Sequence, residues 1–368
     1  MRRIAAVKSR GQNPAANARL FVTASIRILR RSCAARVLRK PLTAAVATLD
    51  PQLNIQRIAG PHSMWFKNLT VYRLPDNWSV SAAELEEKLS RRPLPAVGSF
   101  DMFSRGWVHA SSAQRYVHTT NGQHLIALGV EQKLLPSSII KQVATERAAL
   151  QADQQGFPVG RRQMREIKER VTEELRARAL SRRRVTRAWI DPVNGWFVVD
   201  AAGGNRADEL VETLRDTLGS LPVQFMETER VPHASMAAWL MLGDAPLRFT
   251  ISDDLELQTP DKTKATVRYV RHPLEGKDIQ NHLQSGKYAT RLGLTWNDRI
   301  AFVFTDKLAI KRVEFLEIAK DKSENEGISP EEQFDIDFLL MTGELNQMLN
   351  DLREALGGEV RQPEQRAA

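Results

Sequence analysis

The sequence has almost no cysteine and no long apolar runs. Its 368 residues contain one cysteine, Cys33, so residues 64–368 can form no disulfide, thiolate zinc site or cysteine nucleophile. This pattern suits a reducing cytosol. No stretch of 18 consecutive apolar residues occurs, so we expect no membrane-spanning helix and no membrane partner.

Enzyme signatures are also missing. The seven histidines show no metal-ligand spacing, and Ser285–Lys287 resembles the end of a phosphate-binding loop without its first glycine. The acidic pairs Asp253–Asp254 and Asp335–Asp337 could serve a metal-dependent nuclease. Such pairs more often lie on solvated loops or at helix starts, where the helix dipole favours them. We therefore expect no enzyme, and a nuclease using Asp335 and Asp337 is the least favoured alternative.

Acidic residues are nearly absent from the first 63 residues. This segment carries twelve basic residues and one acidic residue, Asp50, whereas the whole chain has 53 basic and 44 acidic residues. Residues 64–368 therefore have a formal charge of −2, although the calculated pI of the chain is near 9.8. A basic pI normally indicates a nucleic-acid partner, but here the argument has to come from the distribution of charge after residue 63.

The basic segment 1–63 has several explanations. Its composition is typical of a mitochondrial transit peptide, while Arg27, Arg30, Arg31 and Arg36 interrupt the apolar run that a secretory signal needs. A DNA-binding arm is a further alternative. We favour translation starting at Met64, with residues 1–63 as a mis-called or disordered basic extension.

Periodicity after Met64 predicts an α+β fold. Asn121-Gly122 and Pro192–Gly195 are strong hairpin turns, and Ser81 with Glu84 has the spacing of a capping box. Strands are expected over 65–74, 123–131, 185–191, 196–201, 290–304 and 307–316, and helices over 81–89, from 137, 206–218 and 334–356. We infer antiparallel hairpin-plus-helix units in two or three subdomains, near 64–160, 161–260 and 261–358, with a polar linker at 323–327 and a tail at 359–368.

Several large apolar side chains have two interpretations. The aromatic residues in alternating strands could stack on bases, but core packing is favoured for Trp65, Phe66, Trp107, Trp189 and Trp196. A leucine-rich stripe over 339–356 is either core or dimer interface, and its candidate dimer contacts are Leu345, Met348 and Leu352. Gly343 within the same helix suggests close packing by another element.

Two basic sets are the strongest candidates for a binding surface. One lies on a helix after Gly160 and continues beyond it, where Arg182, Arg183, Arg184 and Arg187 have no acidic residue between them. The helix alone could be a solvated surface with ion pairs such as Glu166–Arg170. Cations grouped on a nearly neutral body can bind phosphate without reading bases. The candidate DNA contacts are Arg161, Arg165, Lys168, Arg178, Arg182, Arg183, Arg184 and Arg187 in the first set, and Arg268, Arg271 and Lys277 in the second.

Several motifs follow one another between Met64 and about Gly358. They are Trp65-Phe66-Lys67-Asn68-Leu69-x-Val71-Tyr72-Arg73-Leu74, Gly106-Trp107-Val108, Leu135-Pro136-Ser137-x-x-Ile140-Lys141, Trp189-Ile190-Asp191-x-Val193-Asn194-Gly195, Leu218-Gly219-Ser220-Leu221-Pro222-Val223 and Phe334-Asp335-x-Asp337-Phe338-x-Leu340-Met341-Thr342-Gly343-Glu344-Leu345. In sequence and in order, these motifs resemble the recombination-associated RdgC family. The resemblance implies a bacterial cytosolic, nucleoid-associated homodimeric ring. Such a ring encloses double-stranded DNA without sequence preference, restrains recombinase-driven strand exchange and needs no cofactor. The competing hypothesis is a protein-interaction module that inhibits the recombinase directly.

The resemblance also implies roles for single residues. Arg178 and Ser181-Arg182 match the family's Arg-Ala-x-Ser-Arg stretch near the ring interior, and Arg268 and Arg271 match basic positions. Leu180 is a further candidate dimer contact. It stands where the family has an aromatic residue, and this departure weakens the argument that an aromatic ring inserts across the dimer gate here. His272 and Pro273 replace polar residues, so this loop departs from the family pattern.

Overall fold

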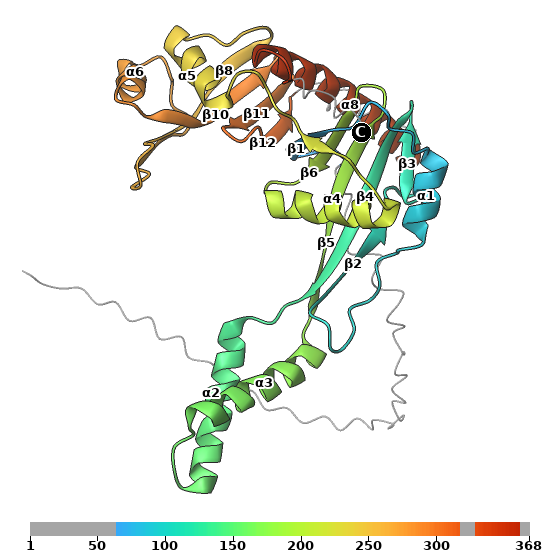
Figure 1. Ribbon diagram of the computed structural model, residues 1–368, viewed down its shortest axis with the longest axis vertical. Coiled ribbons are helices and arrows are strands. Elements are labelled where there is room, and N and C mark those ends of the chain that lie inside the picture. Colours follow the sequence, from blue (N-terminus) through green and yellow to red (C-terminus); the bar gives the residue numbers. More distant parts are fainter. Residues whose placement is uncertain (1–63, 317–327, 361–368) are drawn as a thin grey trace, which may run out of the picture. The chain divides into compact units, whose positions relative to one another are not determined.

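The computed structural model describes residues 64–316 and 328–360 (Figure 1). The predicted basic extension 1–63, the linker 323–327 and nearly all of the tail 359–368 lie outside the described residues. Twelve strands form one sheet with antiparallel pairing, in the order β2-β4-β5-β6-β1-β12-β11-β10-β8-β9, and β3 and β7 pair with β4 and β1. Strands from all three predicted subdivisions therefore share one sheet.

Apart from the strands over 103–108 and 117–120, which the sequence did not predict, and the strand 181–191, which it predicted from residue 185, the elements before residue 220 agree with the prediction. They are β1 (Asn68–Arg73), α1 (Ala82–Ser90), β2 (Phe103–Val108), β3 (Val117–Thr120), β4 (Gln123–Lys133), α2 (Ser137–Gln155), α3 (Arg161–Arg178), β5 (Ser181–Asp191), β6 (Trp196–Asp200) and α4 (Gly204–Leu218). Local chemistry explains the agreement. The Ser81 hydroxyl accepts the backbone N–H of Glu84 at 3.2 Å, and Asn121 and Gly122 adopt the positive φ values that a tight hairpin requires.

The later elements depart further from the prediction. They are β7 (Gln224–Phe225), α5 (Pro232–Leu242), β8 (Phe249–Gln258), β9 (Thr266–Tyr269), α6 (Lys277–Gln284), β10 (Tyr288–Trp296), β11 (Ile300–Thr305), β12 (Ile310–Phe315) and α8 (Pro330–Ala355). The predicted single strand 290–304 is wrong, because Asn297 and Asp298 adopt φ values of 49° and 51° and turn the chain between β10 and β11. Helix α8 also begins earlier than predicted, because Ser329 and Glu332 form a capping box.

The order of the strands repeats on the two sides of β1. Outward from β1 run β6, β5, β4 and β2 on one side and β12, β11, β10 and β8 on the other. In each half a helix follows the strand next to β1: α4 comes after β6, and α8 comes after β12. The α+β class and the antiparallel hairpins are thus confirmed.

Helices α4 and α8 pack on opposite faces of the sheet. Helix α4 contacts β5 and β6 and covers the apolar cluster that holds Trp107 and Phe197. Helix α8 contributes to the other apolar cluster and touches both halves, where Trp196 Nε1 donates to Asn346 Oδ1 at 2.9 Å and Trp296 Nε1 donates to Asp351 Oδ2 at 2.7 Å. One helix therefore ties the two halves together.

The side chains of the α8 stripe belong to the core of the single chain. Leu345, Met348 and Leu352 are completely buried there, which corrects their assignment as dimer contacts. A Cβ on Gly343 would have no heavy atom within 4 Å, apart from the backbone of α8 itself and the adjacent residues. The prediction that another element packs closely on Gly343 is therefore wrong. The aromatic residues Phe66, Trp107, Trp189 and Trp196 are at most 1% exposed, and core packing is confirmed for them.

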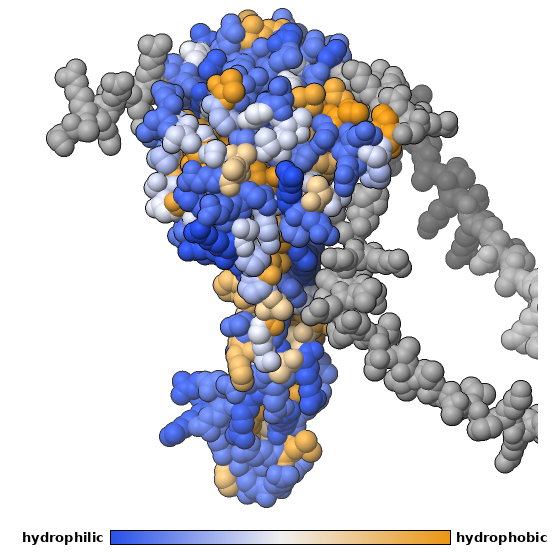
Figure 2. Space-filling model, turned by 90° about the vertical axis from the view of Figure 1, so that its right-hand side faces the viewer, coloured by the Kyte–Doolittle hydropathy of each residue, from blue (hydrophilic) through white to orange (hydrophobic). Residues whose placement is uncertain are grey.

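Helices α2 and α3 form a hairpin inserted between β4 and β5 (Figure 1). The two helices pack through a small apolar cluster of their own, built on Ala144, Ala148, Ile167 and Val171. Figure 2 shows pale and orange surface where this hairpin joins the sheet. Large exposed apolar side chains there include Phe103, Leu134 and Leu180.

Candidate nucleic-acid interface

Three arginines lie close together in the chain at the junction of α3 and β5. Arg178 ends α3, and Arg182 and Arg183 follow at the start of β5. All three side chains are exposed, and none forms an ion pair with a described carboxylate. Arg161, Arg165 and Lys168 on α3 are likewise exposed and make no such pair. The junction therefore presents guanidinium N–H donors that no described ion pair occupies, although the charge of Arg178 acts on Glu174.

The extended backbone of β5 divides its arginines between the two faces of the sheet. Side chains alternate along a strand, so Arg182 and Arg184 share one face and Arg183 and Arg187 the other. The sequence prediction started this strand at residue 185 and not at Ser181, so it did not divide the four candidate DNA contacts between two faces. Arg182, Arg183, Arg184 and Arg187 therefore share a strand but do not form one surface.

Arg184 and Arg187 are occupied within the fold. Arg184 Nη2 lies 2.7 Å from Glu209 Oε2 on α4, and both side chains are mostly buried. Burial lowers the pKa of Arg187, and the nearby Asp200 carboxylate offsets this only in part. Burial likewise raises the pKa of Asp200, against the backbone N–H donors of Asn68 and Lys67. These two arginines are less available to phosphate than Arg182 and Arg183.

The first half of β5 is also a sheet edge. Among the described strands, β6 pairs only with Ala188–Asp191, so Ser181–Arg187 are paired with β4 alone. Charged side chains on such an edge hinder unwanted pairing with other strands. Glu131 on β4 lies opposite Arg183 and accepts a hydrogen bond from the Ser181 hydroxyl. The arginines at this edge can thus protect it in addition to any contact with DNA.

The second basic set lies at the other end of the sheet. Arg268 is on β9, Arg271 follows it with a φ of 51° and donates its backbone N–H to Asp254 Oδ1 at 3.3 Å, and exposed Lys277 begins α6. Six strands separate β5 from β9 in the sheet order, so one chain does not bring the two sets into one patch.

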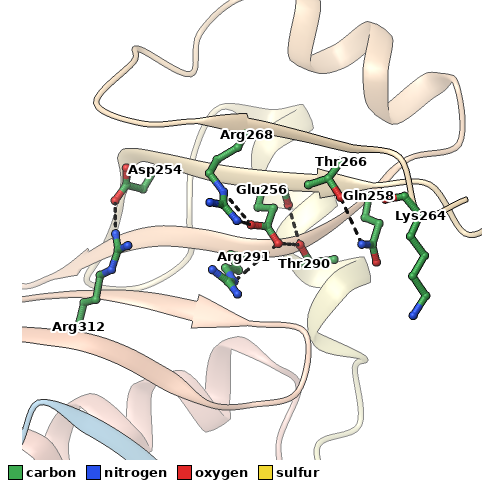
Figure 3. A network of polar contacts seen from close by, with 9 residues as sticks. All are labelled: Asp254, Glu256, Gln258, Lys264, Thr266, Arg268, Thr290, Arg291 and Arg312. Carbon is green, nitrogen blue, oxygen red and sulfur yellow. Dashed lines mark hydrogen bonds and ion pairs between the residues drawn. The ribbon is translucent and has the colours of Figure 1, made fainter. Parts of the chain in front are cut away.

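Sequence reasoning missed two arginines of this second surface, Arg291 and Arg312. Strand pairing places Arg268, Glu256 and Arg291 in one row across β9, β8 and β10. Arg312 on β12 reaches Asp254 on β8, with 3.5 Å between the charged atoms (Figure 3). Register between distant segments brings these residues together, and no local motif could have indicated it.

Glu256 is the centre of the polar network in Figure 3. Its Oε2 accepts from Nε of Arg268 at 2.9 Å and from Nη2 of the same side chain. Its Oε1 accepts from the Thr290 hydroxyl at 3.0 Å and lies 3.7 Å from Nε of Arg291. Burial alone would raise the pKa of Glu256, but these donors and the charges of the two arginines hold it below its usual value.

Comparison with known proteins agrees with the motifs. The family model described as "Putative exonuclease, RdgC" matches residues 64–359. The chain belongs to the RdgC family. It is 50% identical over 300 residues to the recombination-associated protein RdgC of Dechloromonas aromatica, covering 81% of this chain and 99% of that protein. Proteins of the same name from Herminiimonas arsenicoxydans and Bordetella parapertussis are 47% and 44% identical over 296 and 298 residues, covering 80% and 81% of this chain and 99% and 100% of those proteins.

The word exonuclease in the RdgC family description directs attention to the acidic pairs. Asp335 Oδ1 lies 3.0 Å from His118 Nε2, and Asp337 accepts from Gln333 at 2.8 Å. Burial raises the pKa of Asp337 and lowers that of His118. Within residues 64–316 and 328–360, three or more potential metal ligands do not come together anywhere.

In the same ranges no helix is both long and apolar enough to cross a bilayer.

Proposed function

We propose that this RdgC-family chain binds double-stranded DNA through the phosphate backbone, without sequence preference. The observation that carries the proposal is that Arg178, Arg182 and Arg183, which are close in sequence at the junction of α3 and β5, are exposed and form no described ion pair. Some equally exposed arginines elsewhere have carboxylate partners, such as Arg91 with Glu87. Unpaired guanidinium groups keep their N–H donors and their charge for an external anion, and the planar guanidinium fork matches phosphate, like carboxylate, in bidentate geometry.

We further propose that two copies form a ring around the duplex in the bacterial nucleoid and restrain recombinase-driven strand exchange. The family resemblance supports the ring. The separation of the two basic sets within one chain agrees with a lining to which two copies contribute. Exposed Leu180, at the same junction, remains the proposed dimer contact. No cofactor is required for binding of this kind, and affinity of about 10⁻⁴ to 10⁻⁶ M at physiological salt is expected.

The test compares two tandem arginine pairs in the full chain. Arg182→Ala with Arg183→Ala should weaken duplex binding equally on all sequences and reduce the slope of log K against log salt by about 2. The control is Arg91→Ala with Arg92→Ala, which removes the same charge from another exposed pair. Fluorescence anisotropy over a salt series measures both. Equal losses in the two variants would place the contact elsewhere, and a loss that depends on base sequence would contradict backbone binding.

Two further measurements examine the ring and the recombinase. Complexes on closed circular DNA should survive a rise in salt longer than complexes on linear DNA, because an enclosing ring can leave a linear duplex at its ends. Equal survival would contradict enclosure. If the Arg182/Arg183 variant loses DNA binding but still inhibits strand exchange, the protein acts on the recombinase directly.

A further inference from the structure

The row Arg268–Glu256–Arg291 is a preformed group rather than a set of independent surface charges. Neighbouring strands are spaced about 4.8 Å apart, so the backbones of β9 and β10 lie roughly 10 Å apart on either side of β8. Both guanidinium groups nevertheless converge on the carboxylate of Glu256, which lies between them. The side chain of Glu256 is 11% exposed, whereas those of Arg268 and Arg291 are 58% and 43% exposed. The carboxylate of Glu256 is thus mostly buried, while the guanidinium groups of Arg268 and Arg291 remain accessible to solvent.

The donor count leaves capacity for a ligand. Arginine has five N–H donors. Arg268 donates Nε and Nη2 to Glu256, whereas Arg291 makes only an ion pair with Glu256, with 3.7 Å between Nε and Oε1. The remaining donors of both groups are not used in any described hydrogen bond. Two guanidinium groups and one carboxylate give the cluster a net charge of +1. A second carboxylate of the same strand, Asp254, holds Arg312 beside it.

We propose that Glu256 is a positioning residue, which holds Arg268 and Arg291 together as a preformed receptor for one phosphodiester of nucleic acid. The inference rests on the proposed DNA binding. An arginine that is free in solution loses side-chain entropy when it binds, and prior fixation by Glu256 removes part of that cost. Thr290 supports the arrangement, since its hydroxyl donates to the Glu256 carboxylate and so orients it.

Glu256→Gln tests the proposal through the sign of its effect. The substitution removes a negative charge, so electrostatics alone would strengthen binding to DNA. Loss of the anchor should instead weaken it, by about three- to tenfold at fixed salt. Glu314→Gln is the matched control: Glu314 pairs with Ala301 on the same face of the sheet, is exposed and has no described ion pair. Its removal should leave affinity unchanged or slightly increased.

A charge-neutral variant keeps the test decisive if Glu256→Gln fails to fold. Thr290→Val removes only the hydroxyl that orients Glu256, and we expect about two- to threefold weaker binding. Nuclear magnetic resonance of the arginine Nε–H groups should show greater mobility of Arg268 and Arg291 in either variant without DNA. If Glu256→Gln binds as tightly as Glu314→Gln, or Thr290→Val binds as the wild type does, the positioning role is wrong. Wild-type protein that binds no duplex would overturn the proposed function itself.

Discussion

Trp296 on β10 donates its indole N–H to Asp351 on α8 at 2.7 Å. The same carboxylate accepts from Arg248 at 2.7 and 2.9 Å, and the Arg248 guanidinium stacks 4.7 Å above the Trp296 ring. A similar arrangement stands in the other half, where Arg73 stacks 4.1 Å above Trp196 and the indole of Trp196 donates to Asn346. Helix α8 is therefore hydrogen-bonded to each half of the sheet through one tryptophan, Trp196 in the first half and Trp296 in the second.

Replacing Asp351 by alanine should destabilise the fold. The change leaves the completely buried Trp296 without a partner for its N–H and removes the anchor of Arg248, which should cost about 2–3 kcal/mol. Urea unfolding followed by tryptophan fluorescence measures the loss. Asp244→Ala serves as the control, since Asp244 is exposed and its side chain makes no described bond. Equal stability of the two variants would show that α8 is held by apolar packing alone.

Acid should weaken the fold through Asp351 and Glu256. The donors around each carboxylate hold its pKa below the usual value, although burial opposes this. A depressed pKa contributes stability that is present above the unfolded-state value, about 3.9 for Asp and 4.3 for Glu, and is lost as pH falls through the lower folded-state value. We expect the free energy of unfolding to fall below about pH 4, and to fall less steeply in Asp351→Asn. Parallel pH profiles for the two proteins would contradict this.

Two glycines should respond oppositely to alanine. A Cβ on Gly106 would lie 2.5 Å from Leu94 Cα and from Pro93 O, which are backbone atoms held by the hydrogen bond from Leu94 N to Trp107 O. Gly106→Ala should therefore cost about 1–3 kcal/mol. Gly343 in α8 has free space, so Gly343→Ala should stabilise by about 0.5–1 kcal/mol through helix propensity. Thermal unfolding decides both, and destabilisation by Gly343→Ala would mean that another element packs there.

Neighbouring arginines on β5 should separate stability from DNA binding. Arg184→Ala leaves the mostly buried Glu209 without its partner, so it should lower the free energy of unfolding by about 1–3 kcal/mol. Arg183 is exposed and has no described ion pair, so Arg183→Ala should change stability little and weaken DNA binding more. Unfolding and anisotropy measurements on both variants give the comparison. The reverse ranking on DNA would show that the Glu209 ion pair opens on binding.

The sequence by itself determined the elements whose signals are local. The Asn121-Gly122 turn, the Ser81 cap and the apolar stripe of α8 each depend on residues within a few positions of one another, and all three lie where the pattern predicts them. The basic composition of α3 and its continuation into β5 was visible for the same reason. The resemblance to a family was visible in the order of the motifs.

Only the tertiary structure decided which charges meet. Glu209 lies 25 residues from the Arg184 it neutralises, and Glu256 lies 35 residues from Arg291. Strand register sets these pairings, and register depends on how distant segments align across the sheet, so no local pattern encodes it. The alternation of side chains along β5 places Arg182 and Arg183 on opposite faces, and the packing of α8 on the sheet buries Leu345 in the core. The sequence thus shows where the charged residues lie along the chain, but only the fold determines which carboxylate pairs with which arginine.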